Sequence, residues 1–199
     1  MKLEFWFEFG STYSYPTAMR IEQIAAENGV ELRWCPFLLG PIFNAQGWDD
    51  SPFNVYPAKG RYMWKDLERI CALQQIAFKK PAIFPQNGLH AARIACRFSE
   101  ETWLPEFVRS VYIANFEKDL DISDRAVLAH CLPMAAEESE FILAESESKS
   151  SKQLLRENTT RAQTLGIFGA PSFVLGNNLF WGNDRLEMAI DCSLDGSQQ

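Results

Sequence analysis

The sequence predicts an α/β protein in which a block of helices separates the two parts of the chain that form one sheet. Three observations predict this class. A strand, a helix and a second strand are expected within the first 37 residues. A strand hairpin followed by a helix is expected near the C-terminus, and the patterns between these two ends are helical. With 199 residues and 47% hydrophobic content, the chain can bury one sizeable core.

The N-terminal elements form a βαβ unit. Leu3–Phe9 partly alternates aromatic and acidic residues, which is typical of a strand. Tyr13–Glu27 has apolar residues at helical spacing and ends before Asn28-Gly29, a C-terminal helix signal. Val30–Phe37 again alternates and predicts a second strand. Such a unit implies two parallel strands joined by a right-handed crossover.

The middle of the chain predicts a long loop and then helices only. Gly40–Lys59 is rich in proline and aromatic residues without a clear period, so we expect a loop there. Helical patterns follow at Arg61–Ala77, Leu89–Phe98, Glu101–Phe116, Asp124–Met134, Glu137–Glu145 and Ser151–Leu165.

The C-terminal elements are two short strands and a helix. Ser172–Leu175 and Leu179–Trp181 flank a Gly-Asn-Asn turn and predict a hairpin. A helix is expected from Asp184 to Cys192, and Asp195–Gln199 is expected to fray.

The resulting order, βαβ…ββα, is that of a thioredoxin-like fold with a large all-helical insertion. We therefore expect residues 1–42 and 166–199 to form a thioredoxin-like domain, and residues 43–165 to form an inserted loop and helical domain.

Composition excludes several kinds of partner. The formal net charge of −7 would repel a phosphate backbone, so nucleic acid is not expected as a partner. No apolar stretch approaches the roughly 18 residues that indicate a membrane span, and the N-terminus does not resemble a signal peptide, so we expect a soluble cytoplasmic protein. Five widely spaced cysteines without a CxxC motif indicate reduced, structural thiols. The two histidines have no ligand partners at metal-binding spacing, so no metal site is expected.

The first motif that indicates chemistry is Ser11-Thr12-Tyr13-Ser14, at the handover from the first strand to the first helix. Unpaired backbone N–H groups and the helix dipole favour negative charge at a helix N-terminus. A serine cannot form a disulfide, but its hydroxyl can donate a hydrogen bond to an external thiolate and lower the pKa of that thiol. The alternative is that Ser11 or Thr12 simply caps the helix.

Two further motifs lie at the other end of the chain. In Gly169-Ala170-Pro171, a proline directly precedes a strand, and a cis bond there would expose the Ala170 backbone for pairing with an extended peptide. The alternative is an ordinary trans proline at the start of a strand. Trp181-Gly182-Asn183-Asp184-Arg185 precedes a helix, where Asn183 or Asp184 could cap the helix or the Asp184 carboxylate could receive an ammonium group.

Together these motifs resemble the kappa-class glutathione transferases and the 2-hydroxychromene-2-carboxylate isomerases, a DsbA-like branch of the thioredoxin superfamily. The resemblance covers nearly the whole chain and includes two more segments, Pro57–Met63 and Phe84-Pro85. It implies that Ser11 is the catalytic residue and hydrogen-bonds the glutathione sulfur. It also implies that Pro171 is cis and that the Ala170 backbone pairs with the cysteinyl part of glutathione.

The same resemblance implies that Asn183 and Asp184, next to Trp181 and Gly182, hold the γ-glutamyl end of glutathione. For the isomerase it implies that the glutathione thiolate adds to an unsaturated substrate, allows ring opening and bond rotation, and then leaves. It further implies a role in aromatic catabolism and a homodimer.

The substrate half of the site is less well defined. Lys59 and Arg61 could bind the carboxylates of glutathione or of a chromene carboxylate, with Lys59 preferred, or could be surface cations. Trp48 and Asn54 are further candidates. Trp48 follows Gly47, where members of the resembling family often have an asparagine, and Phe53-Asn54 stands where the naphthalene-pathway isomerases carry an Asn-Arg pair. The aromatic residues of this region suit a planar ligand, although core packing would explain them equally well.

Three functions are consistent with these motifs. The leading hypothesis is a glutathione-dependent isomerase that acts on a small aromatic substrate. The first alternative is a kappa-like transferase or peroxidase that acts on another electrophile. The second is a non-catalytic DsbA-like module that holds a peptide along Ala170-Pro171. Without a cysteine at the helix start, a disulfide oxidoreductase is disfavoured.

Overall fold

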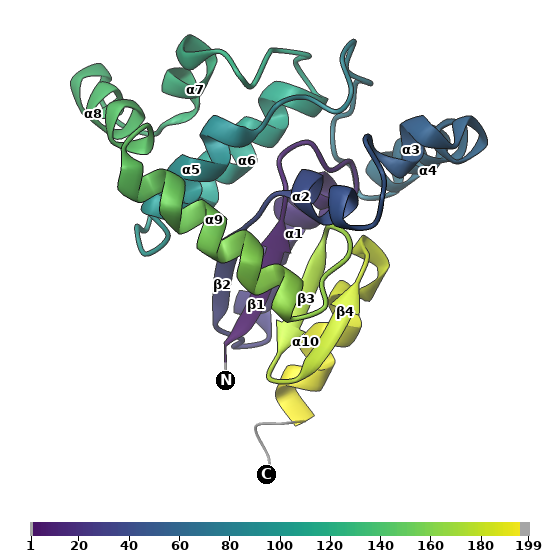
Figure 1. Cartoon of the computed structure of the whole chain (residues 1–199). Helices are drawn as coiled ribbons and strands as arrows, with labels where there is room; N and C mark the ends of the chain where they lie inside the picture. The colour runs from purple at the N-terminus through teal and green to yellow at the C-terminus, as the bar shows by residue number, and fades with distance from the viewer. Residues whose placement is uncertain (1, 196–199) are drawn as a thin grey trace.

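The computed structural model of the protein describes residues 2–195, and within them the strands form one four-stranded sheet in the order β2-β1-β3-β4 (Figure 1). The strands are β1 (Leu3–Phe7), β2 (Leu32–Pro36), β3 (Ser172–Leu175) and β4 (Asn178–Trp181). β1 pairs with β2 in parallel and with β3 antiparallel, and β3 and β4 form the C-terminal hairpin. The predicted βαβ unit, hairpin and α/β class are confirmed.

The helices follow the predicted order. They are α1 (Ser14–Glu27), α2 (Leu39–Ala45), α3 (Pro52–Val55), α4 (Pro57–Leu73), α5 (Leu89–Arg97), α6 (Leu104–Phe116), α7 (Arg125–Cys131), α8 (Ala136–Ser146), α9 (Lys149–Thr164), the 3₁₀ turn η1 (Asn183–Arg185) and α10 (Leu186–Asp195). Among the described residues, the segment between β2 and β3 contains no strand. The tail expected to fray lies outside the described residues beyond Asp195, where α10 ends.

The prediction of a long loop over Gly40–Lys59 is wrong, because this segment contains α2, α3 and the start of α4. Its prolines do not interrupt helices but begin them: Pro52 and Pro57 stand at the first positions of α3 and α4. Proline is favoured there because its missing N–H would have no partner within the helix. The Ser51 hydroxyl accepts a hydrogen bond from the Phe53 N–H at 3.3 Å and caps α3.

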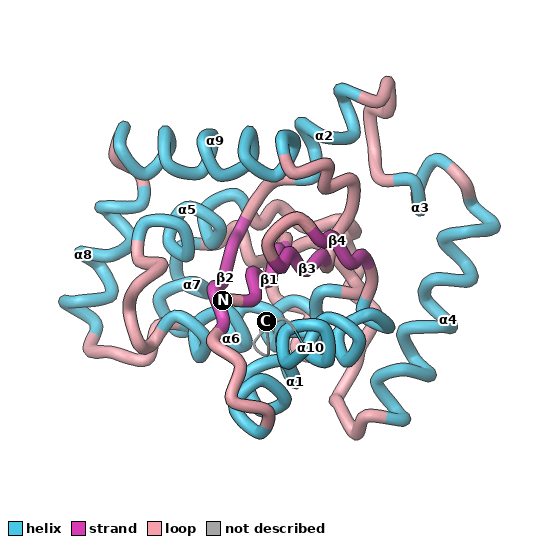
Figure 2. The backbone as a smooth tube through the Cα atoms, turned by 90° about the horizontal axis from the view of Figure 1, so that it is seen from below, coloured by secondary structure: helices cyan, strands magenta, loops and turns pink. Residues whose placement is uncertain are grey.

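Helices cover both faces of the sheet, and the side chains of β1 show why. Leu3, Phe5 and Phe7 point to one face, where they join the core that includes residues of α1 and α10. Trp6 points to the other face and packs with residues of α2 and α9. Viewed from below, α9 and α2 lie on one side of the sheet and α1 and α10 on the other (Figure 2). Alternate side chains of a strand point to opposite faces, so β1 is buried on both.

The cysteines behave as packing residues. Cys35, Cys71 and Cys131 are buried, and all five cysteines are free thiols. Burial raises the pKa of the Cys35 thiol to about 12 and that of Cys71 to about 11. Such thiols are poor nucleophiles near neutral pH, because the thiolate is the reactive form. Within the described residues, no helix is long and apolar enough to cross a membrane.

Candidate functional site

A cavity of about 1530 Å³ lies where the first turn of α1 meets the start of β3 and the corner between β4 and η1. Its other walls are α2, the α3–α4 pair and the segment 84–89. Ligand pockets usually measure roughly 300–1,000 Å³. This cavity is therefore large enough for two small molecules side by side.

Ser11 lies in the cavity wall and is 8% exposed. Its hydroxyl donates a hydrogen bond to the Ala170 carbonyl oxygen at 3.0 Å. The Ser11 hydroxyl oxygen also accepts a long hydrogen bond of 3.4 Å from the Ser14 N–H. Helix capping is therefore the weaker of its two interactions. The stronger one joins the start of α1 to a segment 159 residues away.

The segment that precedes β3 exposes its backbone to the cavity beside Ser11. The Ala170–Pro171 peptide bond is cis, as the family resemblance implies. A side chain at Gly169 would collide with the Trp181 indole, so the ring lies directly against this backbone. Trp181 is 53% exposed and packs on Phe168 with ring centroids 4.8 Å apart. Gly169, Ala170 and Trp181 all line the cavity.

The corner after β4 also lies in the cavity wall. Gly182 has φ +113°, and a Cβ there would stand 2.5 Å from Asp184 Oδ1, so glycine is required. Asn183 is 7% exposed, and its Oδ1 accepts a hydrogen bond from Thr17 Oγ1 at 2.9 Å. The exposed Asp184 carboxylate pairs with Arg185 at 3.0 Å. The 3₁₀ turn η1 begins at Asn183, and no side-chain hydrogen bond caps it.

Side chains of α4 attach its wall of the cavity to the turn that carries Ser11. Thr12 Oγ1 donates to Met63 Sδ at 3.2 Å, and Tyr13 Oη donates to Asp66 at 2.9 Å. Burial and the Asp66 carboxylate raise the Tyr13 pKa, so the phenol remains a donor.

Of the four candidate substrate residues, Trp48 and Lys59 line the cavity, whereas Asn54 and Arg61 do not. Trp48 packs against Phe43 with centroids 5.9 Å apart, and Lys59 Nζ stands 5.5 Å from the Tyr56 ring centroid.

The two residues outside the cavity have other positions. The Asn54 side-chain amide donates to the Asp50 carboxylate at 3.0 Å and to the Phe84 carbonyl at 3.3 Å, so it joins α3 to the segment 84–89. Arg61 is exposed on α4. Residues two apart on a helix point about 200° apart, so Lys59 and Arg61 cannot face the same cavity.

The sequence reasoning does not single out Glu8, which lines the cavity close to Ser11. Glu8 Oε2 accepts a hydrogen bond from the Gly10 N–H at 3.0 Å. Burial raises the pKa of this carboxyl to about 7, and the Gly10 N–H offsets part of that effect. Its sequence signal is an acidic residue between Phe7 and Phe9, directly after the end of β1.

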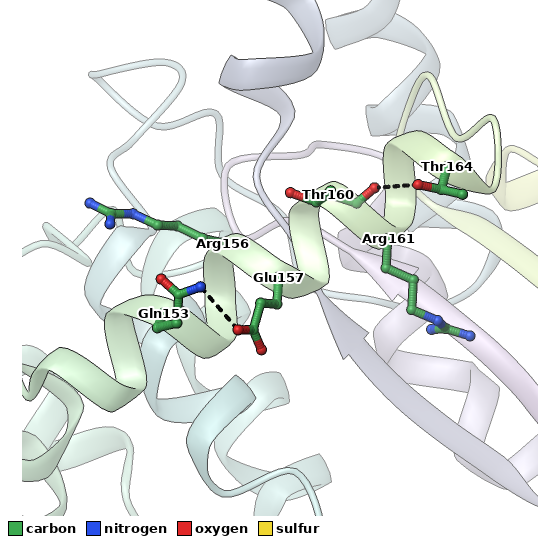
Figure 3. Close-up of a pocket in the computed structure, with 6 residues that line it drawn as sticks. All are labelled: Gln153, Arg156, Glu157, Thr160, Arg161 and Thr164. Atoms are coloured by element: carbon green, nitrogen blue, oxygen red, sulfur yellow. Dashed lines mark hydrogen bonds between the residues drawn. The ribbon is translucent and has the colours of Figure 1, made fainter.

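A second hollow, about 370 Å³, lies along α9 and does not have the features of a site (Figure 3). Its lining residues all belong to this one helix, and most of them already interact with one another or with the sheet. Gln153 donates to Glu157 at 2.9 Å, and Thr164 donates to the Thr160 carbonyl at 3.1 Å. Arg161 pairs with Glu4 at 2.7 Å. The hollow is the surface of a helix whose side chains have local partners.

Comparison with known proteins gives one consistent group. A model of the DSBA-like thioredoxin domain matches residues 2–191. The chain is 26% identical to a 2-hydroxychromene-2-carboxylate isomerase of Sphingobium xenophagum, over 97% of this chain and 98% of that protein. It is 22% identical to glutathione S-transferase kappa 1 of Caenorhabditis elegans, over 96% of this chain and 89% of that one. A solved 2-hydroxychromene-2-carboxylate isomerase has the same fold, with a TM-score of 0.83 over all of both chains at 24% identity.

Proposed function

The chain belongs to the family of DSBA-like thioredoxin domains, and on that premise we propose that it is a glutathione-dependent isomerase of the 2-hydroxychromene-2-carboxylate type. One observation carries the proposal. The helix start that faces the Ala170 backbone presents the hydroxyl of Ser11, and among the described residues none of the five cysteines lines the cavity. A site built this way can bind a thiolate but cannot exchange disulfides.

The cavity residues fit glutathione. Gly169 leaves the backbone before β3 open to a peptide-like ligand, since any side chain there would meet Trp181. The exposed Asp184 carboxylate can receive the γ-glutamyl ammonium group, and Lys59 can reach a carboxylate from the opposite wall. The ammonium group and a carboxylate of glutathione therefore each have an oppositely charged side chain in the cavity.

Glutathione, when bound, supplies a thiolate that can add reversibly to an unsaturated carbon. The chain stabilises that charge in two ways. The N-terminus of α1, whose dipole favours negative charge, directly follows the turn that carries Ser11, and Ser11 can turn its hydroxyl from the Ala170 carbonyl towards the sulfur. A hydrogen bond to an ionised acceptor is stronger than one to a carbonyl, so this exchange of partners favours the thiolate.

The test is a titration of bound glutathione that follows thiolate absorbance in the ultraviolet. In the Ser11→Ala variant we expect the thiol pKa to rise by about one unit, which corresponds to a charge-assisted hydrogen bond of roughly 1.5 kcal/mol. Ser150→Ala, an exposed serine on α9, is the control. An unchanged thiol pKa in Ser11→Ala would remove the proposed role of Ser11.

A second candidate function, transfer of glutathione to an uncharged electrophile, is favoured by the charges of the cavity. Among its described lining residues, the cations are Lys59 and Arg185, and Arg185 is paired with Asp184. Asp49, Asp50 and Asp66 lie on the walls beyond Ser11. Once Lys59 binds a carboxylate of glutathione, no unpaired cation of this set remains for a second anion.

Rates with two matched electrophiles separate the candidates. An unsaturated aromatic ketone and its ring-carboxylate derivative differ by one charge and share the reacting carbon. A preference for the carboxylate supports the isomerase, and consumption of glutathione with preference for the neutral ketone supports the transferase.

A further inference from the structure

We propose that Glu8 accepts the proton of the glutathione thiol and later returns it to the substrate, an inference that rests on the proposed function. The first observation is the turn between β1 and α1. The Ser11 N–H donates to the Glu8 carbonyl oxygen at 3.0 Å, which closes a four-residue turn. The Cα atoms at the ends of such a turn lie within about 7 Å. Glu8 and Ser11 therefore face the same part of the cavity from neighbouring positions.

The second observation is how closely the Glu8 carboxyl is held. Gly10 binds Oε2 with its N–H at 3.0 Å. A Cβ on Gly10 would stand 3.1 Å from Oε2, and one on Gly88 would stand 3.6 Å from Oε1 and 2.6 Å from Phe9 Cβ. Glycines at both positions allow the backbone to close around the carboxyl group. The acid is thus held in the cavity wall that also carries Ser11, where the proposed function places the sulfur.

The third observation is that this acid has no cationic partner. Burial and the Gly10 N–H account for its shifted pKa of about 7, and no lysine, arginine or histidine of the described residues contributes. The titratable group that faces it from α6 is Tyr112, whose hydroxyl donates to the Glu8 carbonyl at 2.9 Å. Burial holds the Tyr112 pKa well above its ordinary value, so this phenol stays neutral. The segment 84–89 packed above brings no charged residue.

A desolvated carboxyl without a partner charge is costly, and groups with such shifted pKa values are typical of functional sites. Here its proton affinity is close to that of a thiol, whose ordinary pKa is about 8.5. Proton transfer between two such groups needs little driving force. A hydrogen bond from the Ser11 hydroxyl to the thiolate can supply that driving force, because it stabilises the charged sulfur. The transfer also avoids a second negative charge, because Glu8 becomes neutral as the thiolate forms.

The atoms balance over the cycle. Glu8 takes the thiol proton, so an S–H bond breaks and an O–H bond forms on the carboxyl group. As sulfur bonds to the unsaturated carbon, the π electron pair moves to the adjacent carbon, which takes the proton from Glu8. In an isomerase, Glu8 removes that proton again after rotation, the double bond re-forms and the S–C bond breaks. Glu8 then returns this proton to the released sulfur, so Glu8 and glutathione both end as they began.

The experiment compares two quantities on binding of reduced glutathione: thiolate formed, from its ultraviolet absorbance, and protons released to the buffer, from an indicator dye. It is run at pH 8, where a carboxyl with a pKa near 7 is about nine-tenths ionised. In the wild-type protein we expect thiolate to form with close to no proton release. The thiolate itself helps Glu8 to keep the proton, because a neighbouring negative charge raises a carboxyl pKa.

In Glu8→Gln we expect either one proton released for each thiolate formed or loss of thiolate formation with binding retained. Glu8→Asp, which keeps the carboxyl group, should restore at least part of the internal transfer if it folds like the wild type by circular dichroism. Glu31→Gln, the same change on an exposed carboxylate, is the control.

Two results distinguish a failure of the role of Glu8 from a failure of the proposed function. One proton released per thiolate in the wild-type protein would overturn the role of Glu8 and leave the proposed function intact. Absence of glutathione binding would overturn both.

Discussion

The replacement of Glu8 by glutamine should change how the stability of the protein depends on pH, whatever reaction it catalyses. The carboxyl has a pKa of about 7 in the folded protein and 4.5 as its ordinary value. The folded state therefore keeps this proton over a pH range in which the unfolded chain has lost it. As a result, the contribution of Glu8 to the unfolding free energy is most favourable at low pH, and it falls as the pH rises from about 4.5 to about 7.

Over the whole pH range, ionisation of Glu8 lowers the unfolding free energy by about 3 kcal/mol. About 2 kcal/mol of this loss falls between pH 5.5 and 8.5. Glutamine cannot ionise, and its side-chain oxygen can still accept the Gly10 N–H. We therefore expect the unfolding free energy of Glu8→Gln, relative to that of the wild type, to rise by about 2 kcal/mol from pH 5.5 to pH 8.5. Other acids contribute equally to both proteins and cancel in the difference.

The assay is urea unfolding of both proteins at several pH values, with the difference in unfolding free energy plotted against pH. Glu31→Gln, on an exposed carboxylate, should give a flat difference curve. If the curve for Glu8→Gln is also flat to within roughly 0.5 kcal/mol, the Glu8 carboxyl is not desolvated in the way described. The base proposed above would then lose its electrostatic basis.

Three further predictions concern the walls of the cavity. Gly169→Ala should weaken glutathione binding about tenfold in calorimetry, because the new methyl group displaces Trp181; equal affinity for Gly169→Ala and the wild type would count against this wall. Gly182→Ala should cost about 1–3 kcal/mol in urea unfolding, because φ is +113° and the Cβ meets Asp184. Gly29→Ala, with positive φ but open surroundings, should cost less, and the reverse order would contradict the steric explanation. Tyr13→Phe removes the bond to Asp66 and should lower stability by about 1 kcal/mol, measured by thermal unfolding; no change would mean that α4 is held to the α1 turn by packing alone.

Most of the fold could be predicted from the sequence because its signals are local. Alternation in Leu3–Phe7 and helical spacing in Ser14–Glu27 depend on neighbouring residues, and these elements appear within a few positions of their predicted bounds. The failure over Gly40–Lys59 has a local cause as well. Proline both ends and begins helices, and only the conformation of the preceding residue, such as the extended Tyr56 before α4, decides which applies.

Site residues could be predicted from the sequence only where they belong to a recognisable motif. Ser11, Ala170 and Asp184 were found because each stands at a strand or helix boundary, and the structure brings all three to one cavity. Lys59 and Arg61 could not be separated by residue type, although their spacing on α4 turns them to different sides. Glu8 was missed because an acidic residue in a strand is ordinarily a solvent-facing one.

The sequence by itself determined the strands and the helices outside Gly40–Lys59, and it determined that a serine rather than a cysteine precedes α1. Both are properties of short stretches of chain. Only the tertiary structure decided that the Ser11 hydroxyl meets a carbonyl 159 residues away, and that the Glu8 carboxyl is enclosed by Gly10 and Gly88. The physical reason is that desolvation and hydrogen bonding depend on what packs against a group, and here the partners come from distant segments.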